Sequence, residues 1–194
     1  MRPARRPPKE VRDEIRRLEI VVAARACVLR KGFHAASMAE IAAEAHLSVG
    51  QIYRYFESKD DIVHAIVEHI ISKRLAWIVS TEGNGDLPTV LAGRALSAED
   101  DDDNAMLMEI NAEASRNPTV AAIVRFADQR LQARGMAAVL MDRPLLDASR
   151  AAAIVEVLAA LAQGAALRQA TVQPARSAAV FEVYRSVIAH LLQT

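Results

Sequence analysis

Residues 47–62 of the chain have the sequence LSVGQIYRYFESKDDI, and the fold follows from this stretch. Serine stands at Ser48 and again at Ser58, and Gln51 and Asp61 follow three residues later in each case. A serine at a helix start accepts a hydrogen bond from the amide three residues on, while the side chain at that position accepts from the serine amide. The spacing therefore predicts two helices, separated at Ser58.

A third serine of the same kind stands upstream, where Ser37 precedes Glu40 by three residues. The capping positions predict a short helix over 38–45 and another over 49–56, joined by only three residues, 46–48. Two short helices with so tight a connection must cross steeply. We therefore expect a helix-turn-helix.

The first helix is expected to precede this motif and to end near residue 31. Apolar residues recur along it at helical spacing, which predicts an apolar stripe facing the core. That stripe consists of Ile15, Leu18, Val22, Ala26 and Leu29. Gly32 is then expected to adopt a left-handed cap conformation, with Phe33 folding back onto the helix. Cys27 is expected to be buried beside the stripe.

The rest of the chain shows helical periodicity and no strand pattern, so the predicted fold class is all-α with about nine helices. A long helix begins at Lys59 and continues through Ile78. Asn117 and Pro118 mark a helix start, and proline breaks the chain again at 144 and 174. The further expected helices span 87–98, 104–116, 118–142, 148–171 and 176–192. The acidic run at 99–103 is expected to be a solvated loop.

Composition excludes several classes of protein. Of 194 residues, 52% are hydrophobic, yet no apolar run approaches the ~18 residues of a membrane span. The basic N-terminus lacks the apolar segment of a secretory signal, so the expected compartment is the cytoplasm. A single cysteine excludes an internal disulfide and a multi-cysteine zinc site. No catalytic triad, glycine-rich phosphate loop or metal-ligand cluster is present, so we expect neither an enzyme nor a cofactor. His64 and Glu68 alone do not make a metal site.

Charge is distributed unevenly along this neutral chain. Residues 1–31 hold 10 basic and 4 acidic side chains, a net charge of +6. A basic end on a neutral protein indicates a polyanionic partner at that end. Within a mobile arm at 1–9, Arg2, Arg5 and Arg6 could enter a minor groove. A disordered, solvated tail explains the same residues equally well.

The segment FHAASMAEIAAEAHLSVGQIYRYFESKDDIV, residues 33–63, resembles the DNA-binding segment of the TetR family of bacterial repressors. The family core pairs a serine and a glycine at the start of its second short helix with later aromatic residues, a serine and a lysine. The matching residues are Ser48, Gly50, Tyr53, Phe56, Ser58 and Lys59. One departure is His46, where the family usually has glycine. We expect a positive φ there, which histidine adopts less easily than glycine.

The resemblance implies a domain plan and a function. Residues 10–57 would form the helix-turn-helix DNA-binding domain, and 58–194 a ligand-binding and dimerisation domain. A homodimer would bind a palindromic operator in double-stranded DNA, and an unidentified small molecule would release it. The alternative is a DNA-binding activator or regulator without small-molecule control. A protein-interaction module that has lost DNA binding fits less well, because the motif is intact.

In the recognition helix, Ile52 and Phe56 lie four residues apart and should anchor it to the protein. Arg54 could contact guanine or a phosphate, Gln51 could contact adenine, and Val49 a thymine methyl group. Gln51 could instead serve only in its capping box, Arg54 could be only solvated, and Tyr53 could be mostly packed against the protein. Lys59 is expected to hold a flanking phosphate. The expected DNA-contacting residues are Ser37, Ser48, Val49, Gly50, Gln51, Tyr53, Arg54, Tyr55 and Lys59.

The C-terminal two-thirds are expected to hold a ligand pocket and a dimer interface, as the resemblance implies. The candidate pocket residues are Trp77, Met106, Met108, Asn111, Phe126 and Met141, any of which could equally be ordinary core. Glu109 and Glu113 would favour a cation if they faced the pocket, although a solvated face explains them better. The candidate interface residues, on the last two apolar helices, are Ala159, Ala160, Gly164, Phe181, Tyr184 and Ile188.

Overall fold

The computed structural model describes residues 8–81, 86–99, 101–172 and 177–193, and within these ranges it contains nine helices and no strand. This confirms the predicted all-α class. The helices are α1 (Lys9–Lys31), α2 (Met38–Glu44), α3 (Val49–Ile52), α4 (Lys59–Ser80), α5 (Leu87–Leu96), α6 (Asp101–Ala114), α7 (Pro118–Asp142), α8 (Ala148–Val172) and α9 (Ala178–Gln193). Residues 1–7 of the arm proposed for 1–9 lie outside the described residues. Lys9, its last residue, already begins α1.

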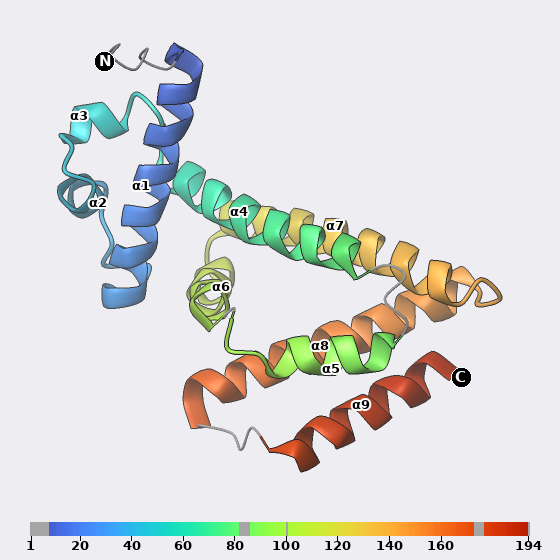
Figure 1. The fold of residues 1–194 in the computed structure, drawn as a ribbon. Helices are drawn as coiled ribbons and strands as arrows, with labels where there is room; N and C mark the ends of the chain where they lie inside the picture. Colours follow the sequence, from blue (N-terminus) through green and yellow to red (C-terminus); the bar gives the residue numbers. More distant parts are fainter. Residues whose placement is uncertain (1–7, 82–85, 100, 173–176, 194) are drawn as a thin grey trace, which may run out of the picture.

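Three parts are visible along the molecule (Figure 1). The helices α1, α2 and α3 form a head at one end. The long helices α4 and α7 run together away from this head, and α5, α8 and α9 lie below them, with α8 running back from the far end of α7. Helix α6 lies between the head and this lower layer and contacts α1, α4, α7 and α8.

All three serine caps form the reciprocal hydrogen bonds that their spacing predicts. The Ser48 amide donates to Gln51 Oε1 at 2.8 Å, and the Gln51 amide donates to Ser48 Oγ at 3.3 Å. Ser37 and Ser58 form the same box with Glu40 and Asp61. These caps satisfy amides that a helix start otherwise leaves unpaired, so they fix where α2, α3 and α4 begin.

Helix α3 is shorter than the expected span of 49–56. Its α-helical part ends at Ile52, and residues 53–55 form turns. The Arg54 and Tyr55 amides donate to carbonyls three residues back, which is the tighter pattern common at helix ends. His46 has a φ of 55°, as expected for the turn. Gly32 has a positive φ of 81°, but its ψ of 160° lies outside the expected left-handed helical region.

The prediction for the buried face of α1 is wrong. Ile15, Leu18, Val22 and Leu29 are exposed by 40–65%, while the opposite face is buried. That buried face consists of Ile20, Val21, Ala24, Cys27 and Val28. Helix α1 is apolar on two sides, and periodicity alone cannot tell which side the neighbouring helices cover. Cys27 is fully buried as expected, and burial raises the pKa of its thiol.

One hydrophobic core continues from the head into α4, α6 and α7. It joins Ile52 and Phe56 of the helix-turn-helix to Ile66 of α4 and to Met106 and Ile110 of α6. A second cluster joins α5, α7, α8 and α9 around Ile154 and Ile188. The shared first core couples the position of the head to the packing of α4 and α6.

The acidic run does not form a solvated loop, contrary to prediction. Its aspartates at 101–103 make the first turn of α6, where the helix dipole favours negative charge. Asp103 is only 5% exposed and lies between two cations. Its carboxylate oxygens are 2.5 Å from Arg25 Nη2 of α1 and 2.5 Å from Lys73 Nζ of α4. Burial alone would raise the pKa of Asp103, but these two hydrogen bonds outweigh it and lower the pKa.

Among the described residues, helix α8 has the length and mean composition of a membrane-spanning helix over 148–171, although the core helix of a soluble protein passes the same test. Arg150, Glu156 and Arg168 interrupt this segment, so it is not a continuous apolar run. Within this single chain, only 22% of that window is buried. Much of the apolar surface of α8 is therefore uncovered in one copy of the chain.

Candidate nucleic-acid interface

The start of α3 presents a polar and aromatic face away from the protein. Ile52 and Phe56 are fully buried and hold the segment to the core, as predicted. Val49 and Tyr53 are exposed by 39% and 53%, and Arg54 is also exposed. An apolar residue and a tyrosine left uncovered beside an arginine on a short helix form a surface suited to a groove of DNA.

Gly50 lies in the middle of this face. A β-carbon placed there would meet no atom of the protein within 4 Å. Packing within the protein therefore does not require glycine at this position. Glycine instead keeps the helix backbone open to a molecule that approaches from outside.

Gln51 is exposed, but part of its side chain is already engaged. Its carbonyl oxygen accepts from the Ser48 amide in the capping box at 2.8 Å. Bidentate contact with adenine needs both the oxygen and the nitrogen of a glutamine side chain. Base contact through Gln51 would therefore compete with the cap, whereas exposed Arg54 carries no such constraint.

Arg17 of α1 holds the end of the recognition segment, a role that the sequence analysis missed. Its guanidinium donates to the Tyr55 carbonyl and stacks over the Phe56 ring at 4.3 Å. Tyr55 itself is half-buried and packs against the core instead of joining the exposed face. The arginine and its partners are 38 or more residues apart, so no local pattern indicates this contact.

Lys59 is directed toward the protein. Its ammonium donates to the Phe33 carbonyl and lies 4.1 Å from the centre of the Phe33 ring. Burial lowers the pKa of this ammonium, although the charges of Glu113, Asp60 and Glu40 oppose that effect. In this structure Lys59 therefore ties the start of α4 to the loop between α1 and α2.

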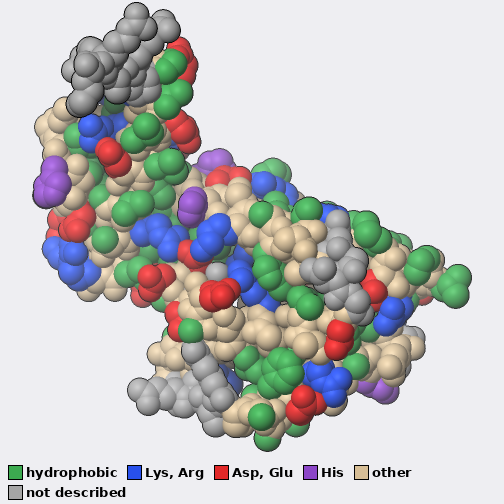
Figure 2. All heavy atoms as spheres, in the orientation of Figure 1, with side chains coloured by type: hydrophobic (Ala, Val, Ile, Leu, Met, Phe, Trp, Pro, Cys, Tyr) green, Lys and Arg blue, Asp and Glu red, His purple; other side chains and the backbone are tan. Residues whose placement is uncertain are grey.

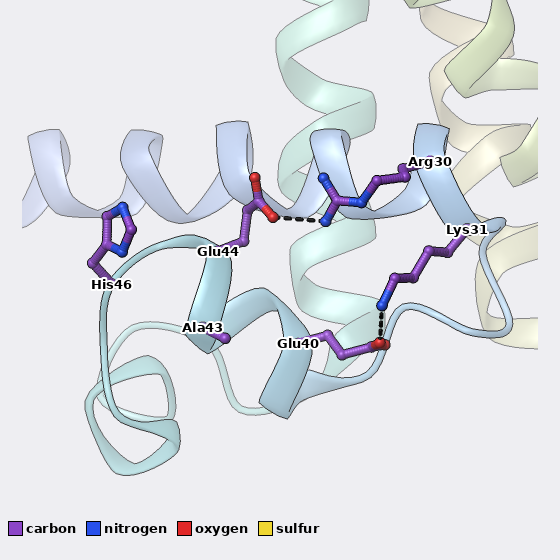
Figure 3. A pocket seen from close by; sticks show the side chains of 6 residues that line it. All are labelled: Arg30, Lys31, Glu40, Ala43, Glu44 and His46. Atoms are coloured by element: carbon purple, nitrogen blue, oxygen red, sulfur yellow. Dashed lines mark hydrogen bonds and ion pairs between the residues drawn. The ribbon is translucent and has the colours of Figure 1, made fainter.

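A hollow of about 340 Å³ lies between α1 and α2 on the head (Figure 3). Its lining side chains pair across it: Arg30 lies 2.7 Å from Glu44, and Lys31 donates to Glu40. The hydrogen bonds from Arg30 and Lys31 lower the pKa values of Glu44 and Glu40. These two ion pairs link α2 to α1 across the hollow and leave its charged side chains paired with one another. Ser37, exposed at the head of α2, lies at the same end of this helix as Glu40.

The structure does not gather the six candidate pocket residues around one cavity. Met106 is fully buried in the core, while Phe126 and Met141 are exposed by 56% and 61%. The buried side of α7 consists of Val120, Ala127 and Val139, which turns Phe126 and Met141 outward. Trp77 and Met108 are partly buried, and Asn111 is exposed. A second hollow, of about 690 Å³, lies instead at the α7–α8 turn and the end of α9.

Glu109 contacts the loop that follows α1, and Glu113 is buried beside Arg116. Glu109 Oε2 accepts from the Phe33 amide at 3.1 Å. Glu113 is buried, with Oε2 2.6 Å from Arg116 Nη2. His64 Nε2 is 3.9 Å from Glu68, which pairs with Arg130 at 2.5 Å. Within the residues that the structure describes, no three metal-ligating side chains cluster.

Some of the candidate interface residues are buried within the single chain, and others are exposed on its surface. Ile188 is buried in the second core, and Phe181 and Tyr184 pack against that core. Ala160 and Gly164 of α8 are exposed, and Ala159 is partly buried. The large apolar side chains that these helices leave exposed are Val157 and Leu167 on α8 and Val183 and Val187 on α9. The burial of Ile188 and the packing of Phe181 and Tyr184 show that these side chains belong to the core of a single copy, and the exposed side of α9 carries Val183 and Val187 instead.

Comparison with known proteins gives consistent matches. A model of the bacterial regulatory proteins of the tetR family matches residues 20–66. The HTH-type transcriptional regulator UidR of Escherichia coli K12 is 33% identical over 111 residues, or 56% of this chain and 57% of UidR. The match thus spans a little over half the length of that relative. BetI of Burkholderia mallei is 27% identical over 195 residues, covering 95% of this chain and 97% of BetI.

Solved structures match over nearly the whole chain. Salmonella enterica GusR has a TM-score of 0.82 at 25% identity, covering 93% of this chain and 96% of GusR. A transcriptional regulator from Rhodococcus has a TM-score of 0.71 at 21% identity, covering 91% and 96%. At that identity the second match indicates a shared fold and nothing more.

Proposed function

Because this chain belongs to the TetR family of bacterial regulatory proteins, we propose that it is a homodimeric transcriptional regulator that binds a palindromic operator. The observation that carries this proposal is the exposed face of α3, open at Gly50 and anchored by Ile52 and Phe56. Residues 10–57 act as the DNA-binding domain and 58–194 as the dimerisation and ligand-binding domain. A regulator of this kind works in the cytoplasm, where bacterial DNA lies.

In this proposal Arg54 makes the principal base contact. Its exposure supports that role, while the cap that occupies the Gln51 carbonyl oxygen leaves Gln51 a secondary one. Val49 meets a thymine methyl group, and Tyr53 and Ser37 donate hydroxyls to phosphates. Lys59 supports the interface from behind by holding Phe33.

The dimer forms through the outward faces of α8 and α9. On α8 the residues Val157, Ala160, Gly164 and Leu167 recur at three- and four-residue spacing along one exposed face. A β-carbon at Gly164 would meet nothing within 4 Å, so this face leaves room for a partner helix. Two copies related by a two-fold axis would place their α3 segments in successive major grooves, roughly 34–36 Å apart.

A small molecule that favours a different spacing of the two heads would release the dimer from DNA. Helix α6 is the part suited to transmit this effect, because Asp103 and Glu109 bond to the head while α6 also packs on α7 and α8. The alternative is an activator or a regulator without small-molecule control. The dispersal of the six candidate pocket residues supports that alternative.

Selection of bound sequences from random duplex DNA, with the purified full chain, tests the proposal. Recovery of a palindrome whose half-site centres lie about one helical turn apart, or a multiple of it, is the expected result. Sequences without two-fold symmetry would contradict the dimeric mode of binding. A ligand screen by thermal shift, followed by release from the selected DNA, then separates the ligand-controlled regulator from the alternative.

A further inference from the structure

The exposed face of α1 is the largest apolar feature of the head that neither DNA binding nor the proposed dimer explains. Val11, Ile15, Leu18, Val22 and Leu29 are the large hydrophobic residues of α1 that are at least 40% exposed. At 3.6 residues per turn they all lie within an arc of about 60°. We call Val11, Ile15, Leu18 and Val22 the α1 stripe; Figure 2 shows hydrophobic side chains along this part of the head.

The spacing of the α1 stripe matches a helix-pairing seam. Its members are four, three and four residues apart, which is the alternation of a coiled-coil heptad. The buried side chains Ile20, Ala24 and Cys27 lie on the opposite side of the same helix. Helix α1 thus packs in its own domain with one face and presents a complete second face to solvent.

Charges beside the stripe select its partner. Residues 9–22 hold four basic and four acidic side chains, so charges of both signs flank the stripe, as at the edges of a helix-pairing seam. Arg12 and Glu19 lie seven residues apart on the same flank of the stripe. Glu19 already pairs with Arg16 at 2.6 Å, and both side chains are roughly half-exposed, so a further cation can approach its carboxylate.

We propose that α1 pairs antiparallel with α1 of a second copy of this chain. In the register centred between Arg16 and Arg17, Ile15 packs on the second copy's Leu18 and Val11 on its Val22. The same register sets Arg12 beside the second copy's Glu19, and two-fold symmetry repeats every contact. Opposite charges therefore meet twice along one flank of the seam, whereas a register that brings Glu19 against Glu19 is repelled.

This contact joins different dimers. The α1 stripe lies on the head, whereas α8 and α9 belong to the separate layer of helices beneath α4 and α7 (Figure 1). In a DNA-bound dimer the two α3 segments enter grooves about 34–36 Å apart, far more than the 8–10 Å between paired helices. Pairing through α1 therefore links dimer to dimer, and it would favour occupation of neighbouring operators through a raised local concentration.

Sedimentation velocity of the full chain across a range of protein concentrations tests the pairing without DNA. The expected result is a dimer that associates to a tetramer. Val22→Asp should lower the tetramer association constant by at least about tenfold, because it sets a carboxylate in the seam. Val22 is 65% exposed, so the fold should survive, which a thermal melt checks. The matched control is Leu145→Asp, at a fully exposed leucine far from the head, and it should change nothing.

A charge exchange tests the register. Arg12→Glu or Glu19→Arg alone should weaken tetramer formation, and the two together should restore it to within about twofold. The proposal is overturned if the tetramer is absent at all concentrations, if Val22→Asp leaves it intact, or if the double exchange fails to restore it. The pairing proposal would also be overturned if the chain floated with phosphatidylserine vesicles and the Val22→Asp variant did not. That result would indicate a membrane partner.

Discussion

Asp103 of α6 lies 2.5 Å from Arg25 of α1, so a buried ion pair joins the end of an acidic run to the DNA-binding head. Lys73 of α4 shares the same carboxylate. Helix α1 of the head also packs directly on α4 and α6. The packing of α6 is thereby tied to the orientation of the head.

Removal of the charge of Asp103 should destabilise the fold. Asp103→Asn leaves two cations around an uncharged amide, and loss of one member of a buried pair costs about 3–5 kcal/mol. We expect the lower end, because Lys73 is 47% exposed and can turn toward water. Urea unfolding measures the change. Asp102→Asn, at the exposed neighbour, is the control and should have little effect.

The same residue predicts a dependence of stability on pH. Because the folded-state pKa of Asp103 is lowered, its contribution is present above the ordinary aspartate pKa, near 4, and is lost as pH falls through the folded value. The difference in unfolding free energy between the wild type and Asp103→Asn should therefore be largest near neutral pH and shrink in acid. A difference that stays constant down to about pH 3 would contradict this role.

Gly50→Ala should separate DNA binding from folding. The added methyl group meets no protein atom, and alanine favours helix, so thermal stability should be unchanged or slightly higher. Affinity for the selected DNA should fall by at least about tenfold, because the methyl group occupies the approach to the groove. Gly93→Ala on α5 is the matched control, where the new atom makes only an ordinary contact with Phe181 at 4.0 Å. Equal DNA affinity in both variants would contradict the assignment of α3 to the DNA interface.

Arg54→Ala and Gln51→Ala should differ on a panel of operator variants. Loss of Arg54 should cost about 1–3 kcal/mol of binding and abolish discrimination at one base pair in each half-site. Gln51→Ala should weaken the capping box and leave sequence preference largely intact. The reverse pattern would transfer the base contact to Gln51.

Lys59→Ala tests whether this lysine supports the interface or touches DNA. Because its ammonium bonds to the Phe33 carbonyl, we expect lower thermal stability and weaker binding, with an unchanged dependence of affinity on salt. A phosphate contact would instead lower the salt slope by about one when it is lost. Titrations at several salt concentrations distinguish the two roles.

Val183→Asp should convert the dimer to a monomer. Val183 is the most exposed of the large apolar residues on α9, so the substitution places a charge on the proposed interface and leaves the core intact. Sedimentation at low protein concentration should show the monomer, and DNA affinity should fall with it. A stable dimer would exclude this face of α9 from the interface.

Local patterns in the sequence predicted the helix starts well. The boxes at Ser37, Ser48 and Ser58 depend on residues three positions apart, so their geometry follows from the sequence alone. The positive φ of His46 followed from the resemblance, because the family usually has glycine at that position of the turn. Such features require no knowledge of what packs on the helix.

Features set by distant contacts were not predictable. The choice of buried face on α1 depends on where α2, α4 and α6 lie, because both faces are apolar. The burial of Asp103 depends on cations 30 and 78 residues away. Arg17 clamps Tyr55 across 38 residues. In each case the residue type is compatible both with exposure and with burial against a partner. Which of the two occurs depends on where the other helices lie.

The central claim is that a dimer contacts palindromic DNA through the two exposed α3 faces. The most direct measurement compares the affinity of the full chain for its selected palindrome with that for a duplex of the same length and scrambled sequence, at one physiological salt concentration. We predict a ratio of at least about 10³, typical of specific binding. A ratio near one would mean that the head binds only the phosphate backbone and would contradict the claim.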